Sequence, residues 1–240
     1  MQKDAIQASV TKRYGTTTIL DNISISLKEG EIFGLLGPSG SGKTTFVKLL
    51  CGIEEASEGK VTVLGERMPD LKIMKRIGYM AQADALYGEL SAYENLEFFA
   101  TLSGVSRRDR KDRILSAMRL VDLEKELQKR VEDFSGGMKR RLSLAIALLH
   151  DPEVLLLDEP TVGIDPSLRQ KIWDTFENLR QKGVLILVTT HVMDEADRCS
   201  RLGMIRDGRL IAVGTPEELK KQTDSTTIEQ AFLSYGGVKE

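Results

Sequence analysis

Residues 37–44 read Gly-Pro-Ser-Gly-Ser-Gly-Lys-Thr, and no other stretch of the sequence limits the possible folds so strongly. The octapeptide matches the pattern G-x-x-x-x-G-K-[ST] at every fixed position. The apolar residues 31–36 before it predict a buried strand, and residues 45–50 after it place apolar side chains at helical spacing. A strand, a glycine-rich loop and a helix in this order predict a phosphate-binding loop.

The predicted loop suits a nucleotide because its glycines let backbone N–H groups approach phosphate oxygens at a helix N-terminus. We expect Lys43 to reach the β- and γ-phosphates and the Thr44 hydroxyl to bind Mg²⁺. The alternative, a glycine-rich turn with a capping threonine, leaves the flanking strand and helix unexplained. The expected nucleotide-binding residues are Gly37, Pro38, Ser39, Gly40, Ser41, Gly42, Lys43, Thr44 and Thr45.

Composition narrows the setting of the protein. The 240 residues can bury a core as one domain, and a net charge of −2 gives no electrostatic indication of a nucleic-acid partner. Cys51 and Cys199 lie far apart without metal-site spacing, so we expect buried thiols in a reducing compartment. The N-terminus has no signal-peptide pattern, and the apolar runs are too short to cross a bilayer. We therefore expect any membrane role to depend on a partner.

Hydrophobic periodicity indicates an α/β fold with two additions. Alternating apolar residues over 6–10 and 23–27, with a further strand over 58–65, predict an antiparallel layer. Residues 91–150 have helical spacing, and a capping box over 91–94 opens them. Ile114, Met118, Leu120 and Leu123 form the expected apolar stripe of this helical lobe, whereas the charged run 107–113 fits a solvated helix face better than a nucleic-acid patch.

A second apolar strand, residues 154–157, runs into Asp158 and Glu159. An acid at a strand end beside a phosphate loop matches the residue that holds Mg²⁺ in P-loop nucleotidases, so we assign that role to Asp158. We assign to Glu159 the polarisation of a water for attack on the γ-phosphate. The alternative, a pair of merely solubilising acids, is less consistent with the neighbouring phosphate loop.

Two histidines, two residues at strand ends and one glycine-rich helix start complete the candidates. His191 follows the buried strand 184–188 and is a candidate sensor of the γ-phosphate, whereas His150 fits a surface position near a helix end. Considered alone, Gln82 at a strand end is an ordinary loop amide, and Tyr14 either packs at a strand end or stacks on adenine. Ser135, Gly136 and Gly137 open a helix, either as an ordinary cap or as an anion site.

These motifs together resemble, essentially end to end, the ATP-binding subunit of an ABC transporter. Residues 37–44 are similar to its Walker A loop, residues 154–158 with Glu159 to its Walker B strand and catalytic glutamate, and residues 163–165 to its D-loop. Gln82 matches the Q-loop glutamine and His191 the switch histidine. Residues 135–137 match the signature motif, with Phe134 and Met138 in place of its usual Leu and Gln. Residues 135–141, together with residues 161–166, are similar to the drug-resistance and ABC-2-type exporter branch.

The resemblance implies one ABC ATPase domain over residues 1–240. Its P-loop core, RecA-like, and antiparallel layer would comprise 1–86 and 151–215, its helical subdomain 87–150, and its C-terminal helix and tail 216–240. ATP and Mg²⁺ would be the cofactors. The resemblance assigns catalysis to Glu159, His191, Lys43 and Gln82, the metal to Thr44, Gln82 and Asp158, and nucleotide contacts to Tyr14, Ser135, Gly136 and Gly137 besides the phosphate loop.

The resemblance also implies partners and a location. Two such chains, identical or paralogous, would close head to tail over two ATP molecules, and integral membrane permease subunits would dock near Gln82 and the helical lobe on the cytoplasmic face of the membrane. Leu86 and Tyr87 are the expected exposed anchors, unless both pack inside the lobe. The alternative function is a non-transport ABC ATPase of DNA repair or translation, but the interval from Lys43 to Ser135 has room only for a small lobe, and the sequence holds one cassette.

Overall fold

The computed structural model of the protein describes residues 3–83 and 85–236, so the predicted C-terminal tail is described only to Gly236. The strands are β1 (Asp4–Tyr14), β2 (Thr17–Lys28), β3 (Ile32–Leu36), β4 (Glu58–Val63), β5 (Glu66–Arg67), β6 (Ile77–Met80), β7 (Val154–Asp158), β8 (Leu185–Thr190), β9 (Arg201–Arg206) and β10 (Arg209–Gly214). The helices are α1 (Lys43–Cys51), α2 (Leu71–Met74), α3 (Ala92–Leu102), α4 (Arg110–Leu120), α5 (Gly136–Leu148), α6 (Pro166–Gln181), α7 (Met193–Ala196), α8 (Pro216–Gln222) and α9 (Ile228–Tyr235), with 3₁₀ turns at Glu124–Glu126 and Val131–Asp133.

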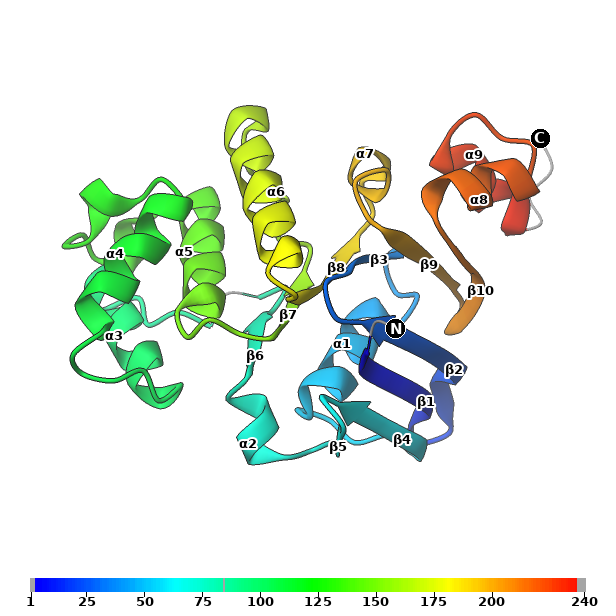
Figure 1. Ribbon diagram of the computed structural model, residues 1–240, viewed down its shortest axis with the longest axis horizontal. Helices are drawn as coiled ribbons and strands as arrows, with labels where there is room; N and C mark the ends of the chain where they lie inside the picture. The colour runs from blue at the N-terminus through cyan, green and yellow to red at the C-terminus, as the bar shows by residue number, and fades with distance from the viewer. Residues whose placement is uncertain (1–2, 84, 237–240) are drawn as a thin grey trace.

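A mostly parallel sheet with the strand order β10-β9-β3-β8-β7-β6 lies at the centre of the molecule (Figure 1). Strands β3, β7 and β8 are buried along their whole length and are mostly apolar, as expected for strands covered on both faces. β8 pairs in parallel with both β3 and β7. Because parallel strands end at the same edge of a sheet, the loops that follow these three strands meet there.

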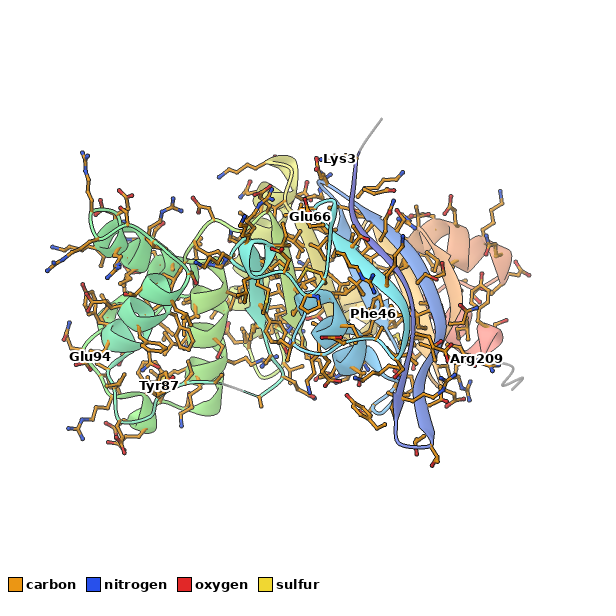
Figure 2. All side chains as sticks on the ribbon, turned by 90° about the horizontal axis from the view of Figure 1, so that it is seen from below. Lys3, Phe46, Glu66, Tyr87, Glu94 and Arg209 are labelled. Carbon is orange, nitrogen blue, oxygen red and sulfur yellow. The ribbon has the colours of Figure 1, made fainter. Side chains whose placement is uncertain are left out.

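The predicted antiparallel layer is confirmed as a second sheet with the order β2-β1-β4-β5. β1 pairs antiparallel with both β2 and β4, and its alternating residues Ile6 and Val10 are buried. These residues share one core with Phe46 of α1 and with Phe33 of the parallel sheet. Helix α1 therefore lies between the two sheets, and Phe46 marks its position in Figure 2.

Helices α3, α4 and α5 gather at one end of the molecule (Figure 1). The capping box predicted for residues 91–94 is confirmed, because Glu94 N donates to Ser91 Oγ at 3.2 Å and Ser91 N donates to Glu94 Oε2 at 2.8 Å. The predicted apolar stripe was wrong in one member. Leu120 is 38% exposed because it lies off the helix face that buries Ile114 and Met118.

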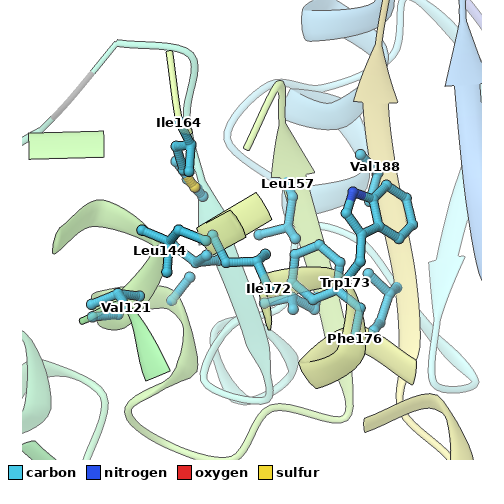
Figure 3. Close-up of a cluster of buried hydrophobic side chains, with 14 of the residues drawn as sticks. Val121, Leu144, Leu157, Ile164, Ile172, Trp173, Phe176 and Val188 are labelled. Atoms are coloured by element: carbon cyan, nitrogen blue, oxygen red, sulfur yellow. The ribbon is translucent and has the colours of Figure 1, made fainter. Parts of the chain in front are cut away.

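A continuous apolar core attaches these helices to the parallel sheet. Figure 3 shows its members from several elements, with Leu144 of α5 and Val121 on one side and Phe176 of α6 with Val188 of β8 on the other. Helix α5 thus packs against both the helical group and the sheet. Arg140 of α5 reaches the end of β7, where it donates to the carbonyls of Asp158 and Glu159.

Two further predictions concern the ends of elements. The hairpin of β9 and β10 is confirmed, and its turn residues Asp207 and Gly208 both have positive φ, at 48° and 74°.

The surface position predicted for His150 was wrong. His150 lies one residue beyond the C-cap of α5, its Nε2 donates to the Ile77 carbonyl at 3.1 Å, and burial lowers the pKa of its imidazole. The ring turns inward toward β6 instead of outward to solvent.

Candidate nucleotide site

The loop between β3 and α1 is shaped by glycines that no larger residue could replace. A side chain on Gly37 would meet the Ile205 carbonyl at 2.3 Å, and Gly42 has a φ of 101° in the left-handed region. Within the part of the chain that the structure describes, no side chain caps α1, so the first backbone N–H groups of α1 remain available to a ligand. The Ser41 hydroxyl is buried beside them without a hydrogen-bond partner among the described residues.

Lys43 is the first residue of α1, and its ammonium group is turned back onto the loop. Lys43 Nζ donates to the Gly37 carbonyl at 2.7 Å and to the Pro38 carbonyl at 2.9 Å. Burial lowers the pKa of Lys43, while the charges of Glu159 and Asp158 oppose that shift. The loop therefore already surrounds a buried positive charge, the partner that an entering phosphate needs.

Asp158 ends β7 and is 1% exposed. Thr44 Oγ1 donates to its Oδ2 at 2.7 Å, and the Thr189 hydroxyl of β8 donates to its Oδ1. Carboxylate and hydroxyl oxygens are ligands that Mg²⁺ accepts, with water and phosphate oxygens filling its other positions. The residues present thus fit this ion, and Thr44 and Asp158 lie close enough together to share it.

Glu159 lies directly beyond Asp158 and contacts His191 at the end of β8. His191 Nδ1 lies 2.9 Å from Glu159 Oε1, so the imidazole donates to the carboxylate. Glu159 N donates to both Thr189 Oγ1 and the Thr189 carbonyl at 3.1 Å. The backbone of Glu159 has a φ of 53°, which non-glycine residues adopt rarely. The two predicted catalytic groups are therefore neighbours beside the phosphate loop.

Gln82 follows β6 and has an exposed side chain. Its carbonyl accepts a hydrogen bond from Arg140 at 2.9 Å. Among the residues that the structure describes, no hydrogen bond joins its side chain to Thr44 or Asp158. The role of Gln82 at the metal therefore stays a prediction.

Ser135 caps α5, since Met138 N donates to Ser135 Oγ at 3.3 Å. Ser135 and Gly136 are exposed, and a side chain on Gly137 would lie 3.2 Å from the Gly163 carbonyl. Over the described ranges, neither a hydrogen bond nor an ion pair joins residues 135–137 to residues 37–45. The second glycine-rich helix start thus faces outward beside the loop 161–165.

Tyr14 ends β1 with a ring that is 48% exposed. Its hydroxyl donates to Glu54, and Lys12 Nζ lies 4.9 Å from the ring centroid. Burial and the hydrogen bond to Glu54 raise the pKa of the Tyr14 phenol. The ring of Tyr14 is therefore exposed beside Lys12 and Glu54, and its stacking on adenine stays a prediction.

Sequence reasoning missed residues that act through distant contacts. Thr189 was part of a recognised strand end, yet only the β7–β8 register places its hydroxyl on Asp158. Arg140 belongs to a run of basic residues that resembles a solvated helix face, but it is only 8% exposed. Glu195 is 3% exposed and accepts hydrogen bonds from Thr161 and Thr190, which tie the loops on either side of the site together.

A phosphate loop with its lysine and threonine, beside an acid-ended strand of a parallel sheet, defines a P-loop nucleotide-binding protein. The signature-type helix start and the histidine after β8 narrow that class. The ABC transporter family profile matches residues 20–162, and the chain belongs to this family as an ATP-binding subunit, as the resemblance implied.

Curated relatives have names that concern export or resistance. The chain is 40% identical over 231 residues to the probable multidrug ABC transporter ATP-binding protein YbhF of Escherichia coli, covering 93% of this chain but 40% of that protein. It is 40% identical to the linearmycin resistance ATP-binding protein LnrL of Bacillus subtilis, over 97% of this chain and 75% of LnrL. It is 44% identical to the Nod factor export ATP-binding protein I of Rhizobium meliloti, over 96% of this chain and 69% of that protein. The chain thus spans less than half the length of YbhF.

Solved structures confirm the predicted fold. The ATP-binding subunit of an ABC transporter superposes with a TM-score of 0.90 at 26% identity, covering 97% of this chain and 99% of that one. The cassette MJ0796, solved as a dimer in a post-hydrolysis state with ADP and Pi, gives a TM-score of 0.82 at 28% identity, covering 88% and 98% of the two chains. The α/β P-loop fold with an antiparallel layer and added helices is therefore established.

Proposed function

We propose that this chain hydrolyses ATP to power an ABC exporter, and that it acts as an ATP-closed dimer on integral membrane permease subunits at the cytoplasmic face of the membrane. The observation that carries the proposal is the Glu159–His191 pair, 2.9 Å apart, directly beyond the buried Asp158–Thr44 pair. The names of the relatives favour export over the alternative of a DNA- or translation-associated ATPase.

In this proposal the phosphate loop exchanges internal hydrogen bonds for substrate. Lys43 Nζ leaves the Gly37 and Pro38 carbonyls and pairs with the β- and γ-phosphates, and the buried Ser41 hydroxyl gains a phosphate oxygen as its partner. Thr44 and Asp158, with Gln82 from the neighbouring loop, hold Mg²⁺ in our assignment. Bound there, the ion would neutralise phosphate charge that develops as the bond to the leaving ADP breaks. Tyr14 stacks on the adenine.

Glu159 is the proposed general base. Its carboxylate accepts a proton from a water while the water oxygen attacks the γ-phosphorus, the bond to the bridging oxygen breaks, and ADP and phosphate form. His191 donates to one carboxylate oxygen and so orients Glu159, and it lies where the γ-phosphate can take over that hydrogen bond. Both residues are carried on ends of buried strands, which keeps their positions precise.

A second copy, or a paralogous ATPase subunit, completes the site. Ser135, Gly136 and Gly137 face outward at the N-terminus of α5, where free N–H groups favour an anion. Their separation from the phosphate loop of the same chain supports a contact with the nucleotide of a partner instead. MJ0796, solved as a dimer, has the same fold. ATP then joins both chains, and its hydrolysis removes the anion that holds them together.

The candidate docking surface for the membrane partner lies on α3 and on the loop before it. In the part of the chain that the structure describes, no helix is both long and apolar enough to cross a bilayer. The expected anchor Leu86 was wrong as an exposed group, because Leu86 is partly buried against the helical core. Tyr87 is 49% exposed and packs edge-to-face on Phe98, itself 43% exposed, with ring centroids 5.0 Å apart. We propose this aromatic pair as the docking surface.

Replacing Glu159 with Gln tests the catalytic core of the proposal. The amide cannot accept the proton, so we expect the rate of phosphate release to fall by about 100-fold to 10,000-fold, with ATP binding retained. Asp133→Asn is the matched control, because Asp133 is an exposed acid in the 3₁₀ turn before α5 and is expected to leave the rate unchanged. A Glu159→Gln protein that hydrolyses ATP at the wild-type rate would show that Glu159 is not the base.

A further inference from the structure

Arg140 of α5 carries a guanidinium group that is buried among backbone carbonyls of two different loops. Its Nη1 donates to the Ala81 carbonyl at 2.7 Å and to the Gln82 carbonyl at 2.9 Å. Its Nη2 donates to the Glu159 carbonyl at 2.8 Å and also to that of Asp158. One side chain thus joins the signature helix to the Gln82 loop and to the end of β7.

These contacts use what distinguishes arginine from lysine. A planar guanidinium can direct several N–H groups at fixed angles, whereas an ammonium group is a single point charge. Burying either cation is unfavourable unless its donors are satisfied. Here the acceptors are carbonyls at the two turns from which Gln82 and Glu159 project, so the positions of those turns depend on Arg140.

The contacts of Arg140 matter most for the backbone of Glu159. Its φ of 53° lies in the left-handed region, so surrounding contacts must hold the residue there. Thr189 holds the amide side through hydrogen bonds of 3.1 Å, and Arg140 holds the carbonyl side. Removing the second support leaves the carboxylate free to turn away from His191.

We propose that Arg140 is a positioning residue that fixes the orientation of Glu159, and with it the Gln82 loop, according to where α5 lies. The inference rests on the proposed role of Glu159 as the base. Because Ser135 at the start of the same helix is the proposed contact with the partner's nucleotide, Arg140 gives that contact a direct connection to the base of its own chain.

Arg140→Lys tests the geometry while keeping the charge. Since a displacement of about 1 Å in a catalytic group can reduce a rate about 100-fold, we expect kcat to fall about 10-fold to 100-fold with KM changed by less than about threefold. Arg141→Lys is the matched control. Arg141 lies on the same helix and also donates to two carbonyls, those of Val121 at 3.1 Å and Asp122 at 3.2 Å, but these belong to the helical group alone. We expect its kcat to stay within about twofold of the wild type.

A double-mutant cycle separates positioning from general damage. If Arg140 acts through Glu159, adding Arg140→Lys to Glu159→Gln should lower the residual single-turnover rate by less than about twofold, because the group it positions is already absent. An equal fold-loss in both backgrounds would overturn the inference, and so would a rise in KM at unchanged kcat.

A spectroscopic measurement on the nucleotide-free protein needs no turnover. The sequence holds two histidines, so the imidazole resonances are few, and His191→Gln assigns them. Arg140→Lys should shift the resonances of His191, whose Nδ1 contacts Glu159, and should leave those of His150 in place; Arg141→Lys should shift neither. Unchanged His191 resonances in a folded Arg140→Lys protein would contradict the inference. Wild-type hydrolysis by Glu159→Gln alone would instead contradict the proposed function, with the His191 shift still observable.

Discussion

At the residue scale, the site keeps its functional groups paired with one another. Lys43 donates to carbonyls of its own loop, Thr44 to Asp158, and His191 to Glu159. In the proposed function, phosphate oxygens would take over the hydrogen bonds of Lys43 and His191, and Mg²⁺ would replace the hydrogen bond between Thr44 and Asp158. Binding therefore exchanges partners and does not require buried charges to be created, which limits the desolvation that opposes binding.

His150 gives a pH prediction at the same scale. Burial lowers its pKa from the ordinary value of 6.5, so the unfolded chain binds a proton at His150 more readily than the folded protein does. Stability is then lost as the pH falls from 6.5 toward the lowered folded-state value. We expect His150→Gln to reduce that loss, by at most about 1.4 kcal/mol for each pH unit.

Urea unfolding at about pH 7 and pH 5 measures the effect. The wild type measured at the same two pH values is the reference, since the two proteins share every other titratable group. An unchanged pH dependence in His150→Gln would contradict the assignment.

Residues at strand ends were predictable, and residues that reach across the fold were not. Asp158, Glu159 and His191 each follow an apolar run, so the strand pattern alone placed them at one edge. The contact of Arg140 with Glu159 depends on how α5 packs against β7, and no local pattern encodes that distance. The inward turn of His150 has the same cause, because its partner Ile77 belongs to a separate strand.

At the element scale, the N-terminus of α5 is an observed helix cap and a proposed anion site. Ser135 satisfies one backbone N–H as a cap, and its exposed position leaves room for an anion beside Gly136. The sequence indicated both possibilities, because a capping serine followed by glycines is consistent with each. Only the fold shows that this helix start is exposed and, among the described residues, has no hydrogen bond to the phosphate loop of its own chain.

Ser135→Arg tests whether the N-terminus of α5 binds the nucleotide of a partner chain. In a Glu159→Gln background with ATP and Mg²⁺, we expect the unmodified loop to support a dimer in size-exclusion chromatography. The arginine side chain should fill the anion site and reduce the dimer fraction at least about tenfold, a change of about 1.4 kcal/mol or more. Ser135→Ala is the control, since it removes the capping hydroxyl without filling the space and should leave a dimer with ATP but not with ADP. A dimer that tolerates Ser135→Arg would place the partner contact elsewhere.

At the scale of the whole molecule, each sheet and the helical group carries a different part of the proposed site. The antiparallel sheet and α1 carry Tyr14 and the phosphate loop, the parallel sheet carries the acids and His191, and the helices carry the proposed partner contacts (Figure 1). Periodicity predicted all three parts, since each has its own repeat. The exposure of Tyr87 beside a partly buried Leu86 could not be predicted, because it depends on how the loop folds over α3.

Tyr87→Asp combined with Phe98→Asp tests the proposed docking surface. Both side chains are exposed, so we expect ATP hydrolysis and the ATP-dependent dimer to stay within about twofold of the wild type. Cosedimentation with membranes that contain the permease partner should be lost, because an aspartate cannot replace a buried aromatic anchor. Val213→Asp, at an exposed apolar position on β10 on the opposite side of the molecule, is the control and should cosediment normally (Figure 1). Normal cosedimentation of the double variant would mean that the partner binds another surface.

The left-handed backbone of Glu159 affects how this protein can be engineered or can evolve. Of the non-glycine residues with positive φ in the described ranges, most are Asn or Asp, which tolerate that conformation, whereas Glu159 does not share their short side chain. A glycine there would relieve about 1 kcal/mol of strain and delete the proposed base. Selection for thermal resistance alone would therefore favour inactive sequences at this position, so consensus or stability-guided libraries of this chain should hold residue 159 fixed.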